Sequence, residues 1–182
     1  MATVGDLPDK EAGTQNRGAE LYRRELVETR ASYEYIDLYR TTLRRWNTRL
    51  DAVRIIATSG GLASWAIFQS YPWIWAGIIG AAQLADIANK IVPIGSQYDA
   101  ATDFLHELDK IIIQALADWE RVQRGQLDIE DIDDLRRKLM ESRSAAEKRC
   151  FSKFGLPEKA HLKHLAEERA KAYFERKLGG IT

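Results

Sequence analysis

Apolar and polar side chains alternate with a helical period along the first part of the chain. Between Ile36 and Val53 the apolar and aromatic positions are separated by three or four residues in turn, which is the spacing of a coiled-coil seam. No glycine or proline interrupts the chain from Ala19 to Ser59. The pattern predicts one long helix from about Arg17 to Val53, preceded by a flexible tail over residues 1–17.

Residues 52–94 contain two apolar segments that a short aromatic turn joins. A helix that crosses a bilayer needs about 20 apolar residues. The first segment, about Ala52–Ser70, is slightly short, and Arg54 extends its usable length by reaching toward the headgroups. The second segment, about Trp73–Ile94, is long enough, and tryptophan and tyrosine rings that favour the headgroup level cluster at the turn. We therefore expect a two-span transmembrane helical hairpin.

The remaining residues predict three further helices. Apolar side chains from Ala101 to Val122 form a second seam with spacings of three and four. Glycines separate this helix from two others expected at about 129–154 and 157–178. The two seams would pack against each other in antiparallel fashion. The predicted fold class is therefore all-α, with a two-transmembrane hairpin and long cytoplasmic helices that form a stalk or bundle.

The distribution of positive charge orients the predicted hairpin. Five arginines lie between residues 40 and 54 against one acidic residue, Asp51, whereas the turn between the spans has no lysine or arginine. Positively charged flanks stay on the cytoplasmic side of a membrane, so both termini are expected in the cytoplasm. The predicted parts are a tail at 1–17, a cytoplasmic helix at 18–51, the hairpin at 52–94 and a cytoplasmic helical region at 95–182.

Polar side chains share one face of the second apolar segment. Gln83, Asp86 and Asn89 recur at spacings of three, which places them on the same side of a helix. Polar and ionisable groups within a span usually face a bundle interior or water, and rings of aspartate favour cations. These three residues are candidates for lining an oligomeric pore. The alternative is that they form the solvated cytoplasmic end of the helix.

The arginines before the hairpin have two interpretations. They fix the topology and contact anionic lipid headgroups, or they bind an anionic ligand such as a nucleotide or oligonucleotide. Guanidinium forks suit phosphate, and an aromatic ring nearby offers a stacking surface for a base. On the second interpretation, the candidate ligand-binding residues are Arg40, Arg44, Arg45, Trp46 and Arg49.

Composition and motifs argue against catalysis and metal binding. Lysine plus arginine and aspartate plus glutamate each number 27, so the net charge is zero and offers no bulk attraction to nucleic acid. The chain has one cysteine and no nucleophile-elbow motif. Its histidines are too few at usable spacing for a zinc site, and its acidic run at residues 128–134 lacks the glycine turn of a calcium loop. We expect no enzyme activity, no cofactor and no metal.

The order of elements resembles a known family. The resemblance rests on three stretches in order: LYRRELVETRASYEYIDLYRTTLRRWNTRLDAVR, the hairpin, and SQYDAATDFLHELDKIIIQALADWERVQRG. Over about residues 18–178 this order is similar to SLATT domains, the two-transmembrane effectors associated with SMODS nucleotidyltransferases and SLOG proteins. The resemblance implies an effector of bacterial anti-phage defence in the inner (cell) membrane. It also implies gating by a nucleotide-derived signal from a partner nucleotidyltransferase.

Three functional hypotheses follow from the sequence. The leading one is a homo-oligomeric, ion-conducting pore, with a tetramer as the natural guess because two spans per subunit enclose no aqueous path alone. Membrane lipid, further copies of the chain and the nucleotide signal would be its partners. The second is a non-conducting membrane adaptor that recruits a partner protein. The third is a soluble helical bundle whose core contains the apolar hairpin.

Overall fold

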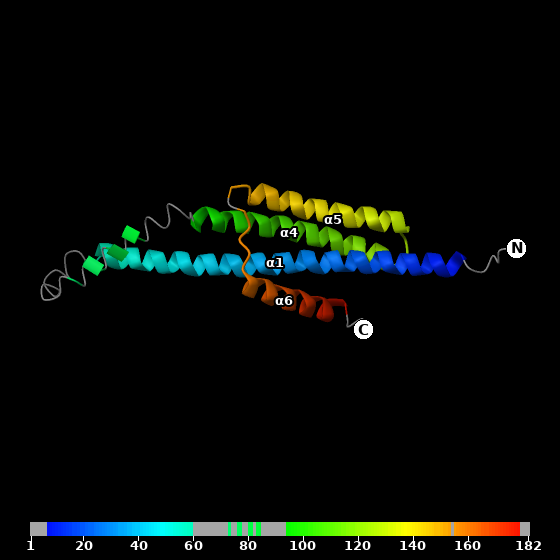
Figure 1. Cartoon of the computed structure of the whole chain (residues 1–182), viewed down its shortest axis with the longest axis horizontal. Helices are drawn as coiled ribbons and strands as arrows, with labels where there is room; N and C mark the ends of the chain where they lie inside the picture. Colours follow the sequence, from blue (N-terminus) through cyan, green and yellow to red (C-terminus); the bar gives the residue numbers. More distant parts are fainter. Residues whose placement is uncertain are drawn as a thin grey trace. The chain divides into compact units, whose positions relative to one another are not determined.

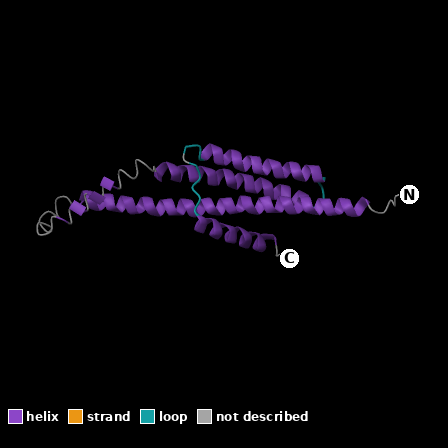
Figure 2. Cartoon of the chain, in the orientation of Figure 1, coloured by secondary structure: helices purple, strands orange, loops and turns teal. Residues whose placement is uncertain are grey.

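The computed structural model of the chain describes residues 7–59, 73, 76–77, 80–81, 83–84, 94–153 and 155–178. Within these residues the regular structure is helical and no strand is found (Figure 1, Figure 2). The long helices are α1 (Leu7–Ser59), α4 (Ile94–Gln123), α5 (Ile129–Cys150) and α6 (Ala160–Leu178). The predicted all-α class is confirmed.

The chain divides into two compact units, which are described separately. The first unit contains Met1–Leu38 and Ala101–Thr182, so it brings together two segments that lie far apart in the sequence. The second unit is Tyr39–Ala100. In its described part Leu43 and Tyr39 are buried, and the Tyr39 hydroxyl donates a hydrogen bond of 2.8 Å to Oε1 of Gln97.

Helix α1 is longer than the pattern predicted. It begins at Leu7 rather than at about Arg17, so part of the segment expected to be a tail is helical. Its apolar seam is buried as expected over Tyr22, Leu26 and Ile36, whereas Trp46 is 53% exposed. The apolar seam of α1 is therefore buried in the first unit, whereas Trp46, in the second unit, is largely exposed.

Two glycines in the connections between helices take the left-handed conformation that side chains rarely adopt. Gly125 lies just after the end of α4 and Gly155 lies between α5 and α6, each with φ of +65°. The turn after α4 leads into α5 through Asp128, whose carbonyl accepts a hydrogen bond of 3.0 Å from the Ile132 amide. These breaks fall within a few residues of the predicted boundaries. They allow α4, α5 and α6 to fold back on α1.

In the first unit α1 contacts each of the other helices. The Tyr22 and Trp119 rings lie parallel with centroids 6.2 Å apart, and the Tyr22 hydroxyl donates to the Ala115 carbonyl at 3.1 Å. Gln15, near the start of α1, donates a hydrogen bond to the carbonyl of Leu127, just past the C-terminal end of α4, so α1 and α4 are antiparallel. The core around these rings is built from Tyr22, Leu26, Ala115, Trp119, Val122, Leu127, Ile132, Leu139 and Phe174.

The prediction of a membrane hairpin at 52–94 is contradicted. Among the described residues, no helix combines the length and the apolar character that a membrane crossing requires. The helices that are long enough carry charged side chains too often: Asp51 lies near the end of α1, and Asp99 and Asp103 near the start of α4. The expected location in the bacterial inner membrane, with both termini cytoplasmic, depended on the hairpin and is wrong on the same finding.

Candidate functional site

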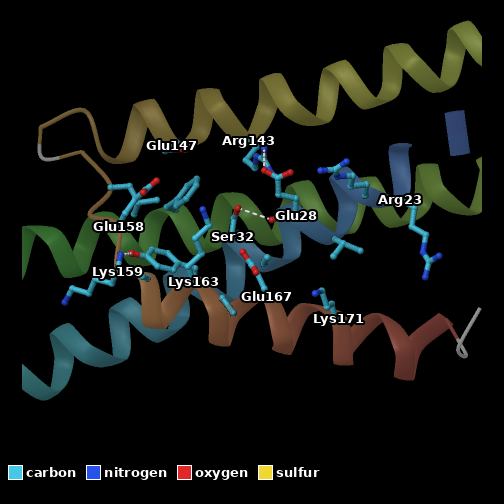
Figure 3. A pocket seen from close by; sticks show the side chains of 18 of the residues that line it. Arg23, Glu28, Ser32, Arg143, Glu147, Glu158, Lys159, Lys163, Glu167 and Lys171 are labelled. Carbon is cyan, nitrogen blue, oxygen red and sulfur yellow. Dashed lines mark hydrogen bonds and ion pairs between the residues drawn. The ribbon is translucent and has the colours of Figure 1, made fainter. Parts of the chain in front are cut away.

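An open groove runs along α1 in the first unit, with a volume of about 1300 Å³. Residues of α1 form its floor, α5 and α6 form its two sides, and the connection from α5 to α6 closes one end (Figure 3). Helix α4 packs against another face of α1 through Tyr22 and Trp119, and its Phe104 also reaches the groove. Three sides of α1 are therefore covered by helices, and the groove exposes the fourth.

The floor of the groove is one continuous stripe of α1. Its members are separated by four and three residues in turn, and they are Arg17, Leu21, Arg24, Glu28, Ala31 and Tyr35. This spacing places them on one face of a helix. With a rise of about 1.5 Å per residue, the stripe is about 27 Å long. Apolar neighbours such as Val27 widen it, so the floor has the length and character of a seat for a helix.

Ion pairs and close packing fix α5 as one side of the groove. The Arg143 guanidinium lies 3.1 Å from Glu28 and 3.8 Å from Glu25, both on α1. The Arg143 and Glu25 side chains are less than one-fifth exposed. Removing one member of a largely buried pair leaves a charge without its partner, so this pairing resists separation of the helices. Nearer the start of α1, Gly18 faces the side chains of Ile129 and Ile132 of α5.

Helix α6 is held on the other side of α1 by an arginine between two rings. The Arg30 guanidinium lies 4.6 Å from the centre of the Tyr33 ring and 4.1 Å from that of Tyr173 on α6. It also pairs with Glu34 at 2.6 Å, and Arg169 of α6 reaches the same carboxylate at 4.0 Å. Cation–π contacts and charge-assisted bonds therefore join α6 to α1 along the groove.

Tyr35 anchors the closed end of the groove. Its hydroxyl donates to the Pro157 carbonyl and accepts a hydrogen bond of 3.1 Å from the Lys159 amide. Burial raises the pKa of Tyr35, and the negative charge of Glu158 raises it further, while the bond from Lys159 acts in the opposite direction. One side chain of α1 thus fixes the backbone that leads into α6.

Charge is unevenly distributed around the groove. The floor begins with Arg17 and Arg24, and Arg23 and Lys171 flank them. No ion pair joins any of these four cations to another side chain that the structure describes. Further along, Arg143 is neutralised by glutamates of α1. The end of the groove near Arg17 and Arg24 therefore carries an excess of positive charge, although Glu20 and Glu167 also line the groove.

The aromatic rings that line the groove are not available for stacking. They belong to Tyr35, which is 8% exposed, and Phe104, which is 1% exposed. The Phe104 ring packs edge-on against Phe151, with centroids 5.6 Å apart. A nucleobase in the groove would find no open aromatic face, although stacking on such a face is a principal source of base affinity.

Gln83 and the residues predicted to bind a ligand do not line this groove. Gln83 is helical and exposed, and Asp86 and Asn89 lie outside the described residues. Among the predicted ligand-binding residues the side chains of Arg44, Arg45, Trp46 and Arg49 are exposed and that of Arg40 is half-buried. None of these five lines the groove.

Sequence reasoning missed the groove residues of α1, although a signal for them exists. Arg17, Arg24 and Ala31 are seven residues apart, so they form a second periodic stripe on the helix that also carries the buried seam. The stripe is mostly polar and therefore resembles an ordinary solvated face. Its position between two packed helices becomes evident only from the fold.

The described residues contain no cluster of three or more histidine, cysteine, aspartate or glutamate side chains that could hold a metal ion. Comparisons with protein-family models, with curated proteins and with solved structures find no match for this chain. The groove is therefore the feature on which a function can be argued.

Proposed function

We propose that the chain is a non-catalytic recruitment module, which binds a helical segment of a partner protein in the groove along α1. The observation that carries this proposal is the uncovered fourth face of α1, bordered by α5 and α6. Helical partners commonly place an apolar face in such a groove, with anchor residues at helical spacing. The proposal keeps one hypothesis from the sequence, an adaptor that recruits a partner protein, and drops the membrane hairpin from it.

The lining of the groove supports a protein ligand. Half-buried Leu21, Val27 and Ala31 offer an apolar floor, while charged side chains of both signs border it. An apolar centre with a polar rim is the usual composition of a protein–protein interface. A floor of about 27 Å accommodates about 18 helical residues, which is five turns. A partner helix of this length would contact α1, α5 and α6 together.

The test is selection of binding peptides from a displayed library of 18-residue, helix-forming sequences. We expect the enriched peptides to carry apolar residues at spacings of three and four, because the floor presents apolar side chains at that period. Ala31→Trp fills the groove with a large ring, and it should weaken binding of the selected peptides by about tenfold or more. Fluorescence anisotropy with labelled peptides measures the change.

The matched control is Ala117→Trp, which adds the same ring to an exposed position of α4 outside the groove. It should leave peptide affinity unchanged, and circular dichroism should show that both variants keep their helix content. Selection without enrichment, or equal binding by the two variants, would show that the groove is not a helix-binding site.

A second candidate is recognition of a nucleotide-derived ligand by the arginines of the second unit. Arg44, Arg45, Arg49 and Trp46 are exposed on α1 and accessible to such a ligand. Binding of a labelled oligonucleotide, measured for the chain and for Arg45→Gln/Arg49→Gln, tests this candidate. The SLATT resemblance and the oligomeric state stay predictions beside it.

A further inference from the structure

We infer that the occupant of the groove is an acidic amphipathic helix of a partner protein, with its carboxylates facing Arg17, Arg23, Arg24 and Lys171. This inference rests on the proposed function and adds the chemistry of the partner. It is carried by charge complementarity at one end of the groove and by apolar contact along its floor.

The four cations have no competing partner among the described side chains. Other charged side chains of the first unit pair with each other, as Arg143 does with Glu25 and Glu28. By contrast, Arg17, Arg24 and Lys171 are exposed at the groove without such a pair, and with Arg23 they outnumber the two unpaired glutamates nearby, Glu20 and Glu167. Cations that lie together at one end of a groove repel each other. A ligand that brings carboxylates relieves this repulsion and gains charge-assisted hydrogen bonds.

The position of the cations predicts how the carboxylates are arranged. Arg17 and Arg24 lie two helical turns apart on the midline of the floor, with Leu21 between them. A bound helix therefore meets positive charge, then apolar surface, then positive charge along one face. Its matching face carries an apolar anchor with acidic residues one turn before and after it. At the closed end, beyond Ala31, it meets charges of both signs from Glu158, Lys159 and Lys163, beside the apolar Leu156 and Ala160.

Other anions fit the groove less well. The rings of Tyr35 and Phe104 are buried, so a nucleic acid gains no stacking. A second copy of the chain would have to present an acidic helix with apolar anchors. Its acidic run at residues 128–134 has Ile132 in the core, which leaves Ile129 as the exposed apolar residue there. These occupants become alternative outcomes of the test.

The test uses three synthetic 18-residue helical peptides that share leucines at spacings of three and four. They differ at the flanking positions, which are all Glu, all Gln or all Lys. We expect the Glu peptide to bind about tenfold more tightly than the Gln peptide, because several exposed ion pairs contribute a few tenths to 1 kcal/mol each. The Lys peptide should bind weakest. The preference for Glu should shrink as salt is raised, because salt screens exposed charges.

The decisive variant is Arg17→Gln/Arg24→Gln, which should reduce affinity for the Glu peptide by about tenfold and leave the Gln peptide unaffected. Arg124→Gln/Arg137→Gln removes the same charge from exposed positions outside the groove, and it should change neither. Circular dichroism of both variants confirms that the helices are intact.

The outcomes distinguish failure of the acidic-partner inference from failure of the proposed helix-binding function. If all three peptides bind equally and Ala31→Trp blocks them, the groove binds helices but the acidic partner is wrong. If no peptide binds, the proposed function fails as well. Oligothymidylate or anionic vesicles that bind more tightly than the Glu peptide, and lose binding in Arg17→Gln/Arg24→Gln, would identify a different anion. Self-association that Arg17→Gln/Arg24→Gln abolishes in sedimentation would identify a second copy as the occupant.

Discussion

At the scale of the residue, Tyr22 shows how one side chain serves both the core and its electrostatics. Its ring is 1% exposed and stacks on Trp119, while its hydroxyl donates to the Ala115 carbonyl of α4. Burial raises the pKa of this hydroxyl well above its ordinary value, and the negative charge of Asp118 raises it further. The native state therefore holds the Tyr22 proton more tightly than the unfolded state does.

This difference predicts a loss of stability in alkaline solution. The contribution of Tyr22 is fully present below the unfolded pKa of about 10. It is lost as the pH rises from there toward the raised native pKa, because only the unfolded state ionises in that interval. Tyr22→Phe should lower the free energy of unfolding by about 1 kcal/mol at neutral pH, through the lost hydrogen bond. It should also flatten the alkaline decline, as measured by urea unfolding at a series of pH values.

The comparison variant is Tyr35→Phe, since burial also raises the pKa of Tyr35. Each substitution alone should remove part of the alkaline decline, and the double variant should remove more than either. An undiminished decline in the double variant would assign the effect to other groups.

At the scale of the element, α1 organises the first unit because three helices pack around it. Arg143 of α5 pairs with Glu28 of α1. From α1, Arg30 contacts the Tyr173 ring of α6, and the Tyr22 hydroxyl donates a hydrogen bond to α4. Close approach of α5 is possible at Gly18, where a methyl group would lie 3.6 Å from the side chains of Ile129 and Ile132. That distance is ordinary van der Waals contact, so the glycine is not required by space.

Gly18→Ala should therefore stabilise the protein. Alanine is favoured over glycine in a helix interior by about 1 kcal/mol, and here the added methyl group also packs against α5. Thermal and urea unfolding followed by circular dichroism measure the gain. Gly13→Ala is the control for propensity alone, because no atom lies within 4 Å of its added methyl group. A loss of stability in Gly18→Ala, together with a gain in Gly13→Ala, would mean that α5 approaches α1 more closely than the structure places it.

At the scale of the whole molecule, the groove brings together four separate parts of the sequence. Its lining comes from residues 17–35, from Phe104, from Arg143 and Glu147, and from residues 156–171. A ligand that contacts several of these parts binds the folded state and not the unfolded chain. Occupation of the groove is therefore linked to the stability of the first unit.

A peptide selected for the groove should raise the free energy of unfolding. At a free concentration of about 100 times its Kd, the expected gain is about 2.7 kcal/mol. Differential scanning fluorimetry, with increasing peptide, should show a rising Tm for the wild-type chain. The Ala31→Trp variant should show no such rise at the same concentrations. A Tm that rises equally in both would place the peptide at another surface.

Local signals explain why much of the fold was predictable. The helical period of the apolar residues depends on near neighbours in sequence, and it indicated the all-α class. Gly125 and Gly155 are local signals too, and they indicated helix boundaries to within a few residues. The hairpin at 52–94 was predicted from hydropathy, and it is contradicted because no helix among the described residues has the length and apolar character of a membrane span. The groove was not predictable, because Arg17 and Lys171 are far apart in the sequence and share a site only after α6 folds onto α1.

The sequence by itself determined that α1 and α4 are amphipathic helices whose seams hold Tyr22 and Trp119. Side-chain periodicity is a local property, and burial of an apolar stripe follows from it. Only the tertiary structure decided which polar residues of α1 are paired within the fold and which line the groove. Arg143 pairs with glutamates of α1, whereas Arg17 and Arg24 line a groove without such partners. Those outcomes depend on how α5 and α6 pack around α1, and long-range packing is not encoded in the period of any one helix.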